Sequence, residues 1–487
     1  MRALLPALLL LAACSGEVEP AVATLTAGEV REVVFDPRAE TGAAFRIELP
    51  PAATGLRVRT EGATHDVELY ARLDAPPQPE TGLWDAATAS AWLDEDLLLE
   101  ASDVYAPGTW HLLVALSPVA AYEMAEPEVR LTLRADAVLP ERAELKVDQV
   151  EQHVLRREHG LRAVFRVALP DDFREPGRRL RLEAFSPLAD VELVAGPSAG
   201  ADVWNAPYGS SARTWTFERL MLDPREVRDE LFLHVYAYAA YETLGAIPVR
   251  VLAATEERDD LSLAPPIEVP PAAAAGSDPT LRAIASTVSI FGPLGAGSGV
   301  VVSPAGLVLT NAHVVVGADE GAEGPASLAA GFPLDAARPP VPSVALTLLD
   351  VREDVDLALL RICGGLDGAP LPADLRFPHV ELAPGRLPLG DELTVLGYPM
   401  TGGSGSLISI TLTRGIVSGY SAEVEGVVYK TDAAVHSGVS GGACIDASGR
   451  LVGLPSASIA DLNEAGGLGY VIPVDRLPVA WRKRIAR

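Results

Sequence analysis

The first half of the sequence carries one pattern twice, and this duplication constrains the fold more than any other feature. Between about residues 25 and 254, four segments recur at a nearly constant offset of about 120 residues. The paired segments are AFRIELP with VFRVALP, DVEL with DVEL, AAYE with AAYE, and EVRLTL with PVRVLA. A steady offset over four landmarks indicates two copies of one domain.

Each copy is built from short runs that are typical of β-strands. In Ala44–Leu49 the apolar residues fall at every second position, which places them on one face of a strand. Turn-forming segments such as PPAATG and REPG separate the runs. Several short strands in about 115 residues favour a β-sandwich. We therefore predict one sandwich at residues 21–136 and a second at residues 140–254.

The order of DVELYARL, APGTWHLLV and YEMAEPEVRLTL in the first copy resembles that of bacterial pre-peptidase C-terminal (PPC) domains. Such domains commonly accompany secreted proteases. Nothing in either copy assembles a catalytic set. The histidines here are scattered, and each is interpreted as a surface or strand residue: His65, His111, His153, His159 and His234.

The chain begins with a short apolar run, in MRALLPALLLLAACSG, that is typical of an export signal. It is shorter than the ~20 residues that span a bilayer as a helix. Leu11–Cys14 resembles the lipobox of bacterial lipoproteins, which are cleaved before a lipid-modified Cys. The resemblance predicts a lipoprotein signal peptide at residues 1–13 and a membrane anchor on Cys14. Because Ser15 rather than Asp follows, we expect the outer membrane, facing the periplasm or the surface. An ordinary signal peptide cut near Ala13 is the alternative.

The net charge of −27 argues against a nucleic-acid partner. Such proteins need basic faces that displace counterions from phosphates. The acidity fits solubility in an aqueous compartment.

Residues 255–279 read TEERDDLSLAPPIEVPPAAAAGSDP, without a sustained hydrophobic period. Charge, Pro and Ala dominate, which predicts an extended, semi-stiff linker and a domain boundary. At its end, Asp278 and Pro279 predict the N-cap and first residue of a short helix.

Residues 280–487 contain about ten short β-rich runs separated by Gly, Pro or Asp. This pattern favours paired β-barrels over an α/β-hydrolase, which needs helices between parallel strands. Residues 317–340 are rich in Ala, Gly and Pro, so we predict a surface loop there.

Three residues of this half form a candidate catalytic set. His313 lies in TNAHVV, Asp356 in EDVDLALLRI and Ser440 in HSGVSGG. A serine hydroxyl needs an adjacent base, and the base needs an orienting acid. The chain order His, Asp, Ser is that of chymotrypsin-like enzymes. Taken singly, the three also fit a structural histidine, a turn aspartate and a turn hydroxyl.

Six ordered motifs resemble the signatures of the trypsin-like serine proteases, in their HtrA/Deg branch, over about residues 280–480. They are TNAHVV, DLALLRI, LGYP, RGIVSG, TDAAVHSGVSGGA and GYVIPVDRL. The resemblance implies a serine endopeptidase that hydrolyses peptide bonds of envelope or extracellular proteins through an acyl-enzyme. Its substrate would be an unfolded or extended polypeptide, and no cofactor is implied. The predicted fold is therefore all-β: two tandem β-sandwiches followed by a double β-barrel, chymotrypsin-like protease domain at residues 280–487.

Because the sequence ends soon after GYVIPVDRL, no PDZ domain is expected. The peptide sensing and the trimer of the HtrA family are therefore not carried over, and the oligomeric state stays open.

The nucleophile loop also suggests an oxyanion hole and a specificity pocket. Backbone N–H groups of Gly438 and Ser440 would face the oxyanion. The resemblance places small or apolar residues around S1: Ala434, Val435, Leu454, Pro455 and Ser456. Without an acid at the pocket base, a small or medium apolar P1 residue is expected.

The loop departs from the usual motif of the family that it resembles at Ser437 and at Val439, whose β-branched side chain is stiff. We expect His436, another departure, to line S1 or face solvent.

Two other functions remain open: an inactive protease-fold scaffold or binding lipoprotein, and a carbohydrate- or envelope-binding protein with a vestigial protease. No Cys/His cluster has metal-ligand spacing, so no metal site is predicted. Cys363 and Cys444 lie in apolar runs and are expected to be buried free thiols.

Overall fold

The chain divides into two compact units, Met1–Glu141 with Arg156–Ala163, and Arg142–Leu155 with Val164–Arg487. The predicted signal peptide and Cys14 lie outside the residues that the structure describes. The computed structural model describes residues 22–38, 42–51, 53, 55–88, 94–100, 108–117, 128–173, 175, 178–199, 208–211, 216–227, 230–237, 245–258, 260–271, 278–292, 295–315, 328–399, 409–423, 426–456 and 468–486.

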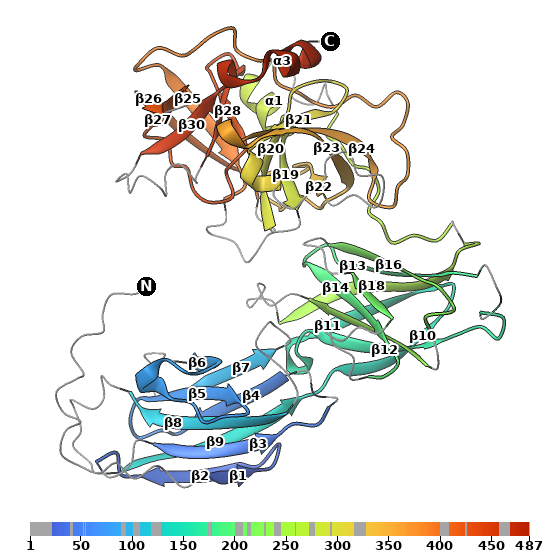
Figure 1. The fold of residues 1–487 in the computed structure, drawn as a ribbon, viewed down its shortest axis with the longest axis vertical. Coiled ribbons are helices and arrows are strands. Elements are labelled where there is room, and N and C mark those ends of the chain that lie inside the picture. The colour runs from blue at the N-terminus through green and yellow to red at the C-terminus, as the bar shows by residue number, and fades with distance from the viewer. Residues whose placement is uncertain are drawn as a thin grey trace. The chain divides into compact units, whose positions relative to one another are not determined.

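The first copy of the repeat folds into two β-sheets around an apolar core (Figure 1). One sheet has the strand order β1-β3-β8-β5-β6 and the other β2-β9-β4-β7. The strands are β1 (Ala23–Leu25), β2 (Val30–Phe35), β3 (Ala43–Glu48), β4 (Gly55–Glu61), β5 (Val67–Leu73), β6 (Ala86–Thr88), β7 (Asp96–Glu100), β8 (Thr109–Leu116) and β9 (Val129–Val138). The alternation in AFRIEL appears as alternating burial: Phe45 and Ile47 are buried while Arg46 and Glu48 are exposed.

The second copy repeats this topology strand for strand. Its sheets have the orders β10-β12-β17-β14-β15 and β11-β18-β13-β16, so each strand number is that of its counterpart plus nine. The strands are β10 (Glu141–Lys146), β11 (Gln149–Arg156), β12 (Arg162–Ala168), β13 (Leu180–Phe185), β14 (Val191–Gly196), β15 (Gly209–Ser211), β16 (Phe217–Leu222), β17 (Leu231–Ala237) and β18 (Ala246–Thr255). The tandem-sandwich prediction is confirmed.

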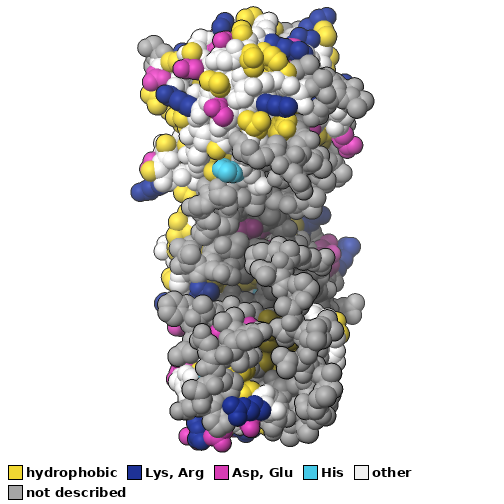
Figure 2. Space-filling model, turned by 90° about the vertical axis from the view of Figure 1, so that its left-hand side faces the viewer, with side chains coloured by type: hydrophobic (Ala, Val, Ile, Leu, Met, Phe, Trp, Pro, Cys, Tyr) yellow, Lys and Arg dark blue, Asp and Glu magenta, His cyan; other side chains and the backbone are white. Residues whose placement is uncertain are grey.

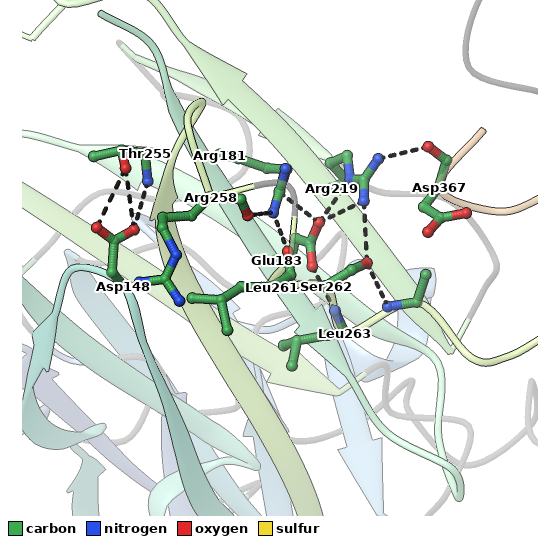
Figure 3. Close-up of polar contacts among 11 residues, drawn as sticks. Asp148, Arg181, Glu183, Arg219, Thr255, Arg258, Leu261, Ser262, Leu263 and Asp367 are labelled. Carbon is green, nitrogen blue, oxygen red and sulfur yellow. Dashed lines mark hydrogen bonds and ion pairs between the residues drawn. The ribbon is translucent and has the colours of Figure 1, made fainter. Parts of the chain in front are cut away.

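Part of the predicted linker packs onto the second sandwich. Leu263 is 1% exposed, and its N–H donates to the buried Glu183 carboxylate at 2.7 Å. Figure 3 shows Arg181 and Arg219 converging on the same carboxylate, at 2.9 and 2.6 Å. Arg219 also donates to the Asp367 carbonyl at 3.0 Å (Figure 3). The burial of Leu263 and its hydrogen bond to Glu183 fix the middle of the linker, which was predicted to be extended and semi-stiff.

A short helix precedes the first barrel, as predicted. In α1 (Pro279–Ser286) the Asp278 carboxylate accepts hydrogen bonds from Thr280 N at 2.8 Å and Leu281 N at 3.3 Å. Pro279 occupies the first turn, where its missing N–H costs nothing.

Two closed six-stranded barrels follow, which confirms the predicted chymotrypsin-like architecture (Figure 1). Their orders are β19-β20-β21-β24-β23-β22 and β25-β26-β27-β30-β29-β28. The first contains β19 (Thr287–Gly292), β20 (Gly295–Val301), β21 (Leu307–Thr310), β22 (Leu328–Gly331), β23 (Val344–Arg352) and β24 (Leu357–Gly365). The second contains β25 (Glu392–Gly397), β26 (Thr411–Glu423), β27 (Gly426–Thr431), β28 (Ala443–Ile445), β29 (Leu451–Pro455) and β30 (Gly469–Pro473). After them comes α3 (Val479–Ile485).

The first barrel corrects one prediction. A surface loop was predicted at residues 317–340, of which residues 317–327 lie outside the described part of the chain. Within the rest, Leu328–Gly331 is the fully buried strand β22, which pairs with β19 and β23. Small residues are needed here, because a Cβ on Gly331 would lie 2.8 Å from the Val341 carbonyl oxygen. The Ala- and Gly-rich composition therefore marks close packing at this strand.

Cys363 and Cys444 differ in exposure, although both were expected to be buried. Cys444, on β28, is buried, and burial raises the pKa of its thiol. Cys363 is exposed on β24, because it shares the outward face of that strand with Arg361. Both cysteines are free thiols, as predicted, but the predicted burial of Cys363 was wrong.

No described helix is long and apolar enough to cross a bilayer. Figure 2 shows Lys and Arg side chains interspersed with acidic and hydrophobic ones on the described surface that it presents.

Candidate active site

His313 and Asp356 meet at the end of two neighbouring strands of the first barrel. His313 lies in the 3-10 turn Ala312–Val315, just after β21, and Asp356 immediately precedes β24, which pairs with β21. His313 Nδ1 lies 2.9 Å from Asp356 Oδ1 and 3.0 Å from Oδ2. The backbone N–H of His313 donates to the same Oδ1 at 3.1 Å. The carboxylate therefore holds both the ring and the main chain of the histidine.

Asp356 is itself held by two further residues. Ser456 Oγ donates to Asp356 Oδ2 at 3.1 Å, and Asn311 Nδ2 donates to the Asp356 carbonyl oxygen at 2.9 Å. Asp356 has a left-handed backbone, with φ of 52°, an uncommon conformation in which Asp is enriched. Ser456 was predicted as an S1 residue, and the structure adds its contact with the acid. Asn311 was missed, although it stands two positions before His313.

Ser440 is 4% exposed and lies in a tightly packed turn of the second barrel. Its carbonyl oxygen accepts from Ser298 N at 3.0 Å, and the next residue, Gly441, donates to the Pro455 carbonyl at 3.0 Å. Gly441 has φ of +81°, and a Cβ there would lie 2.1 Å from Thr310 Oγ1. Only glycine fits at this position, so the loop packs directly against the strand that leads to His313.

The loop before Ser440 has the shape of a turn, closed by the Val439 N–H donating to the His436 carbonyl at 3.1 Å. Gly438 has φ of +90°. Val439 is 5% exposed and joins the apolar core of the second barrel, so its side chain anchors the loop. Ser437 and His436 are exposed.

The predicted S1 residues fall into a buried group and a more exposed group. Leu454, Pro455 and Ser456 are buried on or just after β29, whereas Ala434 is exposed and Val435 half-buried. A Cβ on Gly469, at the start of β30, would lie 2.5 Å from Val435 Cγ2.

Within the described residues, no group of three or more His, Cys, Asp or Glu side chains could hold a metal ion.

Residues 297–454 match the family model described as trypsin-like peptidase domain. This span contains His313, Asp356 and Ser440. The match covers about one third of the chain and leaves the sandwiches outside it.

Curated relatives are similar to the same part of the chain. Protease Do-like 1, chloroplastic, of Arabidopsis thaliana is 30% identical over 191 residues, which are 38% of each chain. Putative serine protease HhoA of Synechocystis is 32% identical over 201 residues, covering 37% of this chain and 41% of the relative. Serine endoprotease DegS of Escherichia coli is 32% identical over 187 residues, covering 36% and 44%. The chain spans less than half the length of these relatives.

A crystal structure of the serine endoprotease from Yersinia pestis overlaps 42% of this chain and 65% of that chain, with a TM-score of 0.31 and 23% identity.

The C-terminal part of the chain therefore contains a trypsin-like peptidase domain. Over this part the chain is related to the Deg/HtrA proteases, to which Protease Do-like 1 and DegS belong.

Proposed function

We propose that the protein is a serine endopeptidase in which Ser440 is the nucleophile, His313 the general base and Asp356 the orienting acid. The observation that carries the proposal is the double contact of His313 with Asp356, through Nδ1 at 2.9 Å and the backbone N–H at 3.1 Å. A proton on Nδ1, donated to the carboxylate, leaves Nε2 as the acceptor for the serine proton.

In the proposed reaction, Ser440 Oγ attacks the scissile carbonyl carbon while His313 Nε2 takes the hydroxyl proton. The tetrahedral oxyanion is stabilised by the N–H groups of Gly438 and Ser440. Collapse breaks the C–N bond, and His313 returns the proton to the leaving amine. Water, deprotonated by His313, then hydrolyses the acyl-enzyme and regenerates Ser440.

The substrate class follows from the same site. The C-terminal domain is related to proteases, so the substrate is a polypeptide, and we assign an unfolded or extended one from envelope or extracellular proteins. Ala434 and Val435 present small apolar surfaces where the P1 side chain would lie, which supports apolar P1 residues. In this proposal the sandwiches, as PPC-like modules, dock substrates or act as spacers.

We also propose a cellular location for the protein, on the bacterial envelope. The lipobox-like segment before Cys14 supports a lipid anchor and export to the periplasmic or outer face of the envelope. Metabolic labelling with an alkyne fatty acid should mark the wild type and spare Cys14→Ser. Equal labelling of the two would reject the anchor.

Labelling of the mature protein with a fluorophosphonate tests the enzyme itself. Wild type should label and cleave unfolded casein, and Ser440→Ala should do neither while folding normally. A wild type that neither labels nor cleaves would instead support the inactive scaffold.

A further inference from the structure

Ser298, on strand β20 of the first barrel, reaches the nucleophile loop of the second barrel with both its side chain and its main chain. Its Oγ donates to the Gly438 carbonyl at 2.7 Å, and its N–H donates to the Ser440 carbonyl at 3.0 Å. Ser298 has no exposed surface, so water does not compete for these bonds. No motif in the sequence pointed to this residue.

The direction of the Ser298 hydroxyl proton follows from its second partner. The Tyr398 N–H, just after β25, donates to Ser298 Oγ at 2.9 Å. A backbone N–H can only donate, so the single hydroxyl proton is left for the Gly438 carbonyl. The hydroxyl thus links the end of β25 to the loop that precedes Ser440.

The two bonds from Ser298 fall on alternating peptide units of the loop. One holds the unit between Gly438 and Val439, and the other holds the unit after Ser440. The unit between them carries the N–H of Ser440. Glycine has little steric preference of its own, so the φ of +90° at Gly438 needs an outside constraint. Ser298 supplies it from one side, and the buried Val439 side chain supplies it from the other.

The neighbouring packing also keeps Ser298 close to the loop. A Cβ on Gly397 would lie 2.9 Å from both Ser298 Oγ and Val439 Cγ1. The Ser298 carbonyl accepts from Thr310 Oγ1 at 2.7 Å, three residues before His313. Ser298 is therefore joined to the strand of the histidine as well as to the loop of the serine.

We infer that Ser298 is a positioning residue, which holds the loop so that the N–H groups of Gly438 and Ser440 point at the substrate oxyanion. This inference rests on the proposed peptidase function. It predicts that losing the hydroxyl impairs the transition state, where charge develops on that oxygen, and spares ground-state binding.

The test compares Ser298→Ala with Ser303→Ala. Ser303 is a matched control, because it is also a buried serine of the first barrel, and its Oγ accepts from Leu307 N at 3.0 Å. For Ser298→Ala, kcat on an internally quenched peptide should fall about 10- to 100-fold, with KM within about twofold of wild type. Affinity for a peptide boronate should fall in parallel. In the Ser440→Ala background, affinity for the uncleaved peptide should not change.

Several outcomes would overturn the inference. One is a kcat of Ser298→Ala equal to that of Ser303→Ala at matched thermal stability, which would make the hydroxyl merely structural. Another is an equal loss of peptide and boronate affinity. If Ser298→Ala does not fold, Ser298→Cys keeps an atom at the γ position that donates weakly. An unchanged kcat in that variant would also reject the inference.

Failure of the proposed function looks different, because wild type itself then neither labels with fluorophosphonate nor cleaves. In that case the positioning role of Ser298 is rejected together with the proposed peptidase function.

Discussion

The carboxylate of Asp356 binds His313 twice, through the ring at 2.9 Å and through the backbone N–H at 3.1 Å. A single oxygen atom, Oδ1, takes part in both contacts. Ring orientation and tautomer are therefore tied to the position of the main chain. Ser456 and Asn311 hold Asp356 in turn, so the orientation of His313, the candidate base, does not depend on bound substrate.

Replacing Asp356 with Asn should lower kcat by roughly 10⁴-fold and leave KM nearly unchanged. The amide NH₂ would face Nδ1 and favour the tautomer that has its proton on Nε2, which cannot accept the serine proton. Steady-state kinetics on a quenched peptide measure this. Asp354→Asn is the matched control, because Asp354 lies two residues away in an exposed ion pair with Arg352. A comparable loss in both variants would contradict the assigned role.

Gly441→Ala should abolish activity and destabilise the fold, because its Cβ would lie 2.1 Å from Thr310 Oγ1 and 2.4 Å from the Ser298 carbonyl oxygen. Gly390→Ala provides the control. Gly390 has φ of +88°, close to the +81° of Gly441, but nothing lies within 4 Å of its added Cβ. It should cost only the roughly 1–2 kcal/mol of a left-handed Ala. Thermal melts of both variants separate backbone strain from the clash, and equal shifts would contradict the packing.

The sequence predicted those features that local chemistry determines. The period-2 alternation around Phe45 predicted a strand there, and the repeated landmarks predicted two copies of one domain, whose sheets the structure shows to have the same strand order. Asp278 before Pro279 gave the helix start, because an N-cap and its N–H partners lie within three residues. The candidate triad could be proposed because each member lies in a distinctive motif, and the structure brings two of its members, His313 and Asp356, into contact.

Features that depend on distant partners were not predictable. Ser298 contacts Gly438 across 140 positions of sequence, and no local pattern encodes that contact. Strand β22, Leu328–Gly331, was not predicted because Ala and Gly have low strand propensity. Its small residues are explained by close packing in the closed barrel, which the local sequence does not reveal. Cys363 was misplaced because an apolar run does not say which side of a strand faces solvent.

The two described thiols should react at very different rates. In a Cys14→Ser variant of the native protein, iodoacetamide should alkylate Cys363, which is exposed, and spare Cys444. Burial excludes the reagent from Cys444 and raises the pKa of its thiol, so little thiolate forms. Peptide mass mapping before and after unfolding in guanidinium reads out both sites. Native labelling of Cys444 at the rate of Cys363 would show that the second barrel opens readily.

Cleavage sites should carry Val, Ala or Leu at P1 rather than Lys or Arg. The reason is the apolar character of Ala434 and Val435, which offer a P1 side chain no charged partner of their own. Mass spectrometry of casein fragments gives the P1 profile, with Ser440→Ala as the blank. A strict preference for Lys or Arg would refute the assignment of this pocket.

Asp446 should make stability depend on pH through the turn that follows β28. Its Oδ1 accepts from Ser448 N and Arg450 N, each at 2.9 Å. Partial burial acts to raise the pKa of Asp446, but the hydrogen bonds from Ser448 and Arg450 outweigh it and hold the pKa below its usual value. A carboxyl with a lowered pKa stabilises the fold above about pH 4, and this contribution disappears as pH falls through the native pKa.

Asp446→Asn should therefore lower the free energy of unfolding by about 1 kcal/mol at pH 7, since a neutral oxygen accepts these bonds more weakly. The gap between wild type and variant should close at acid pH, where Asp446 is protonated too. Urea unfolding of both proteins across this pH range measures it. Asp354→Asn again serves as control, because the Asp354 carboxylate has an exposed partner and should give a smaller difference at pH 7. A gap for Asp446→Asn that stays constant down to the acid limit would show that its hydrogen bonds do not depend on charge.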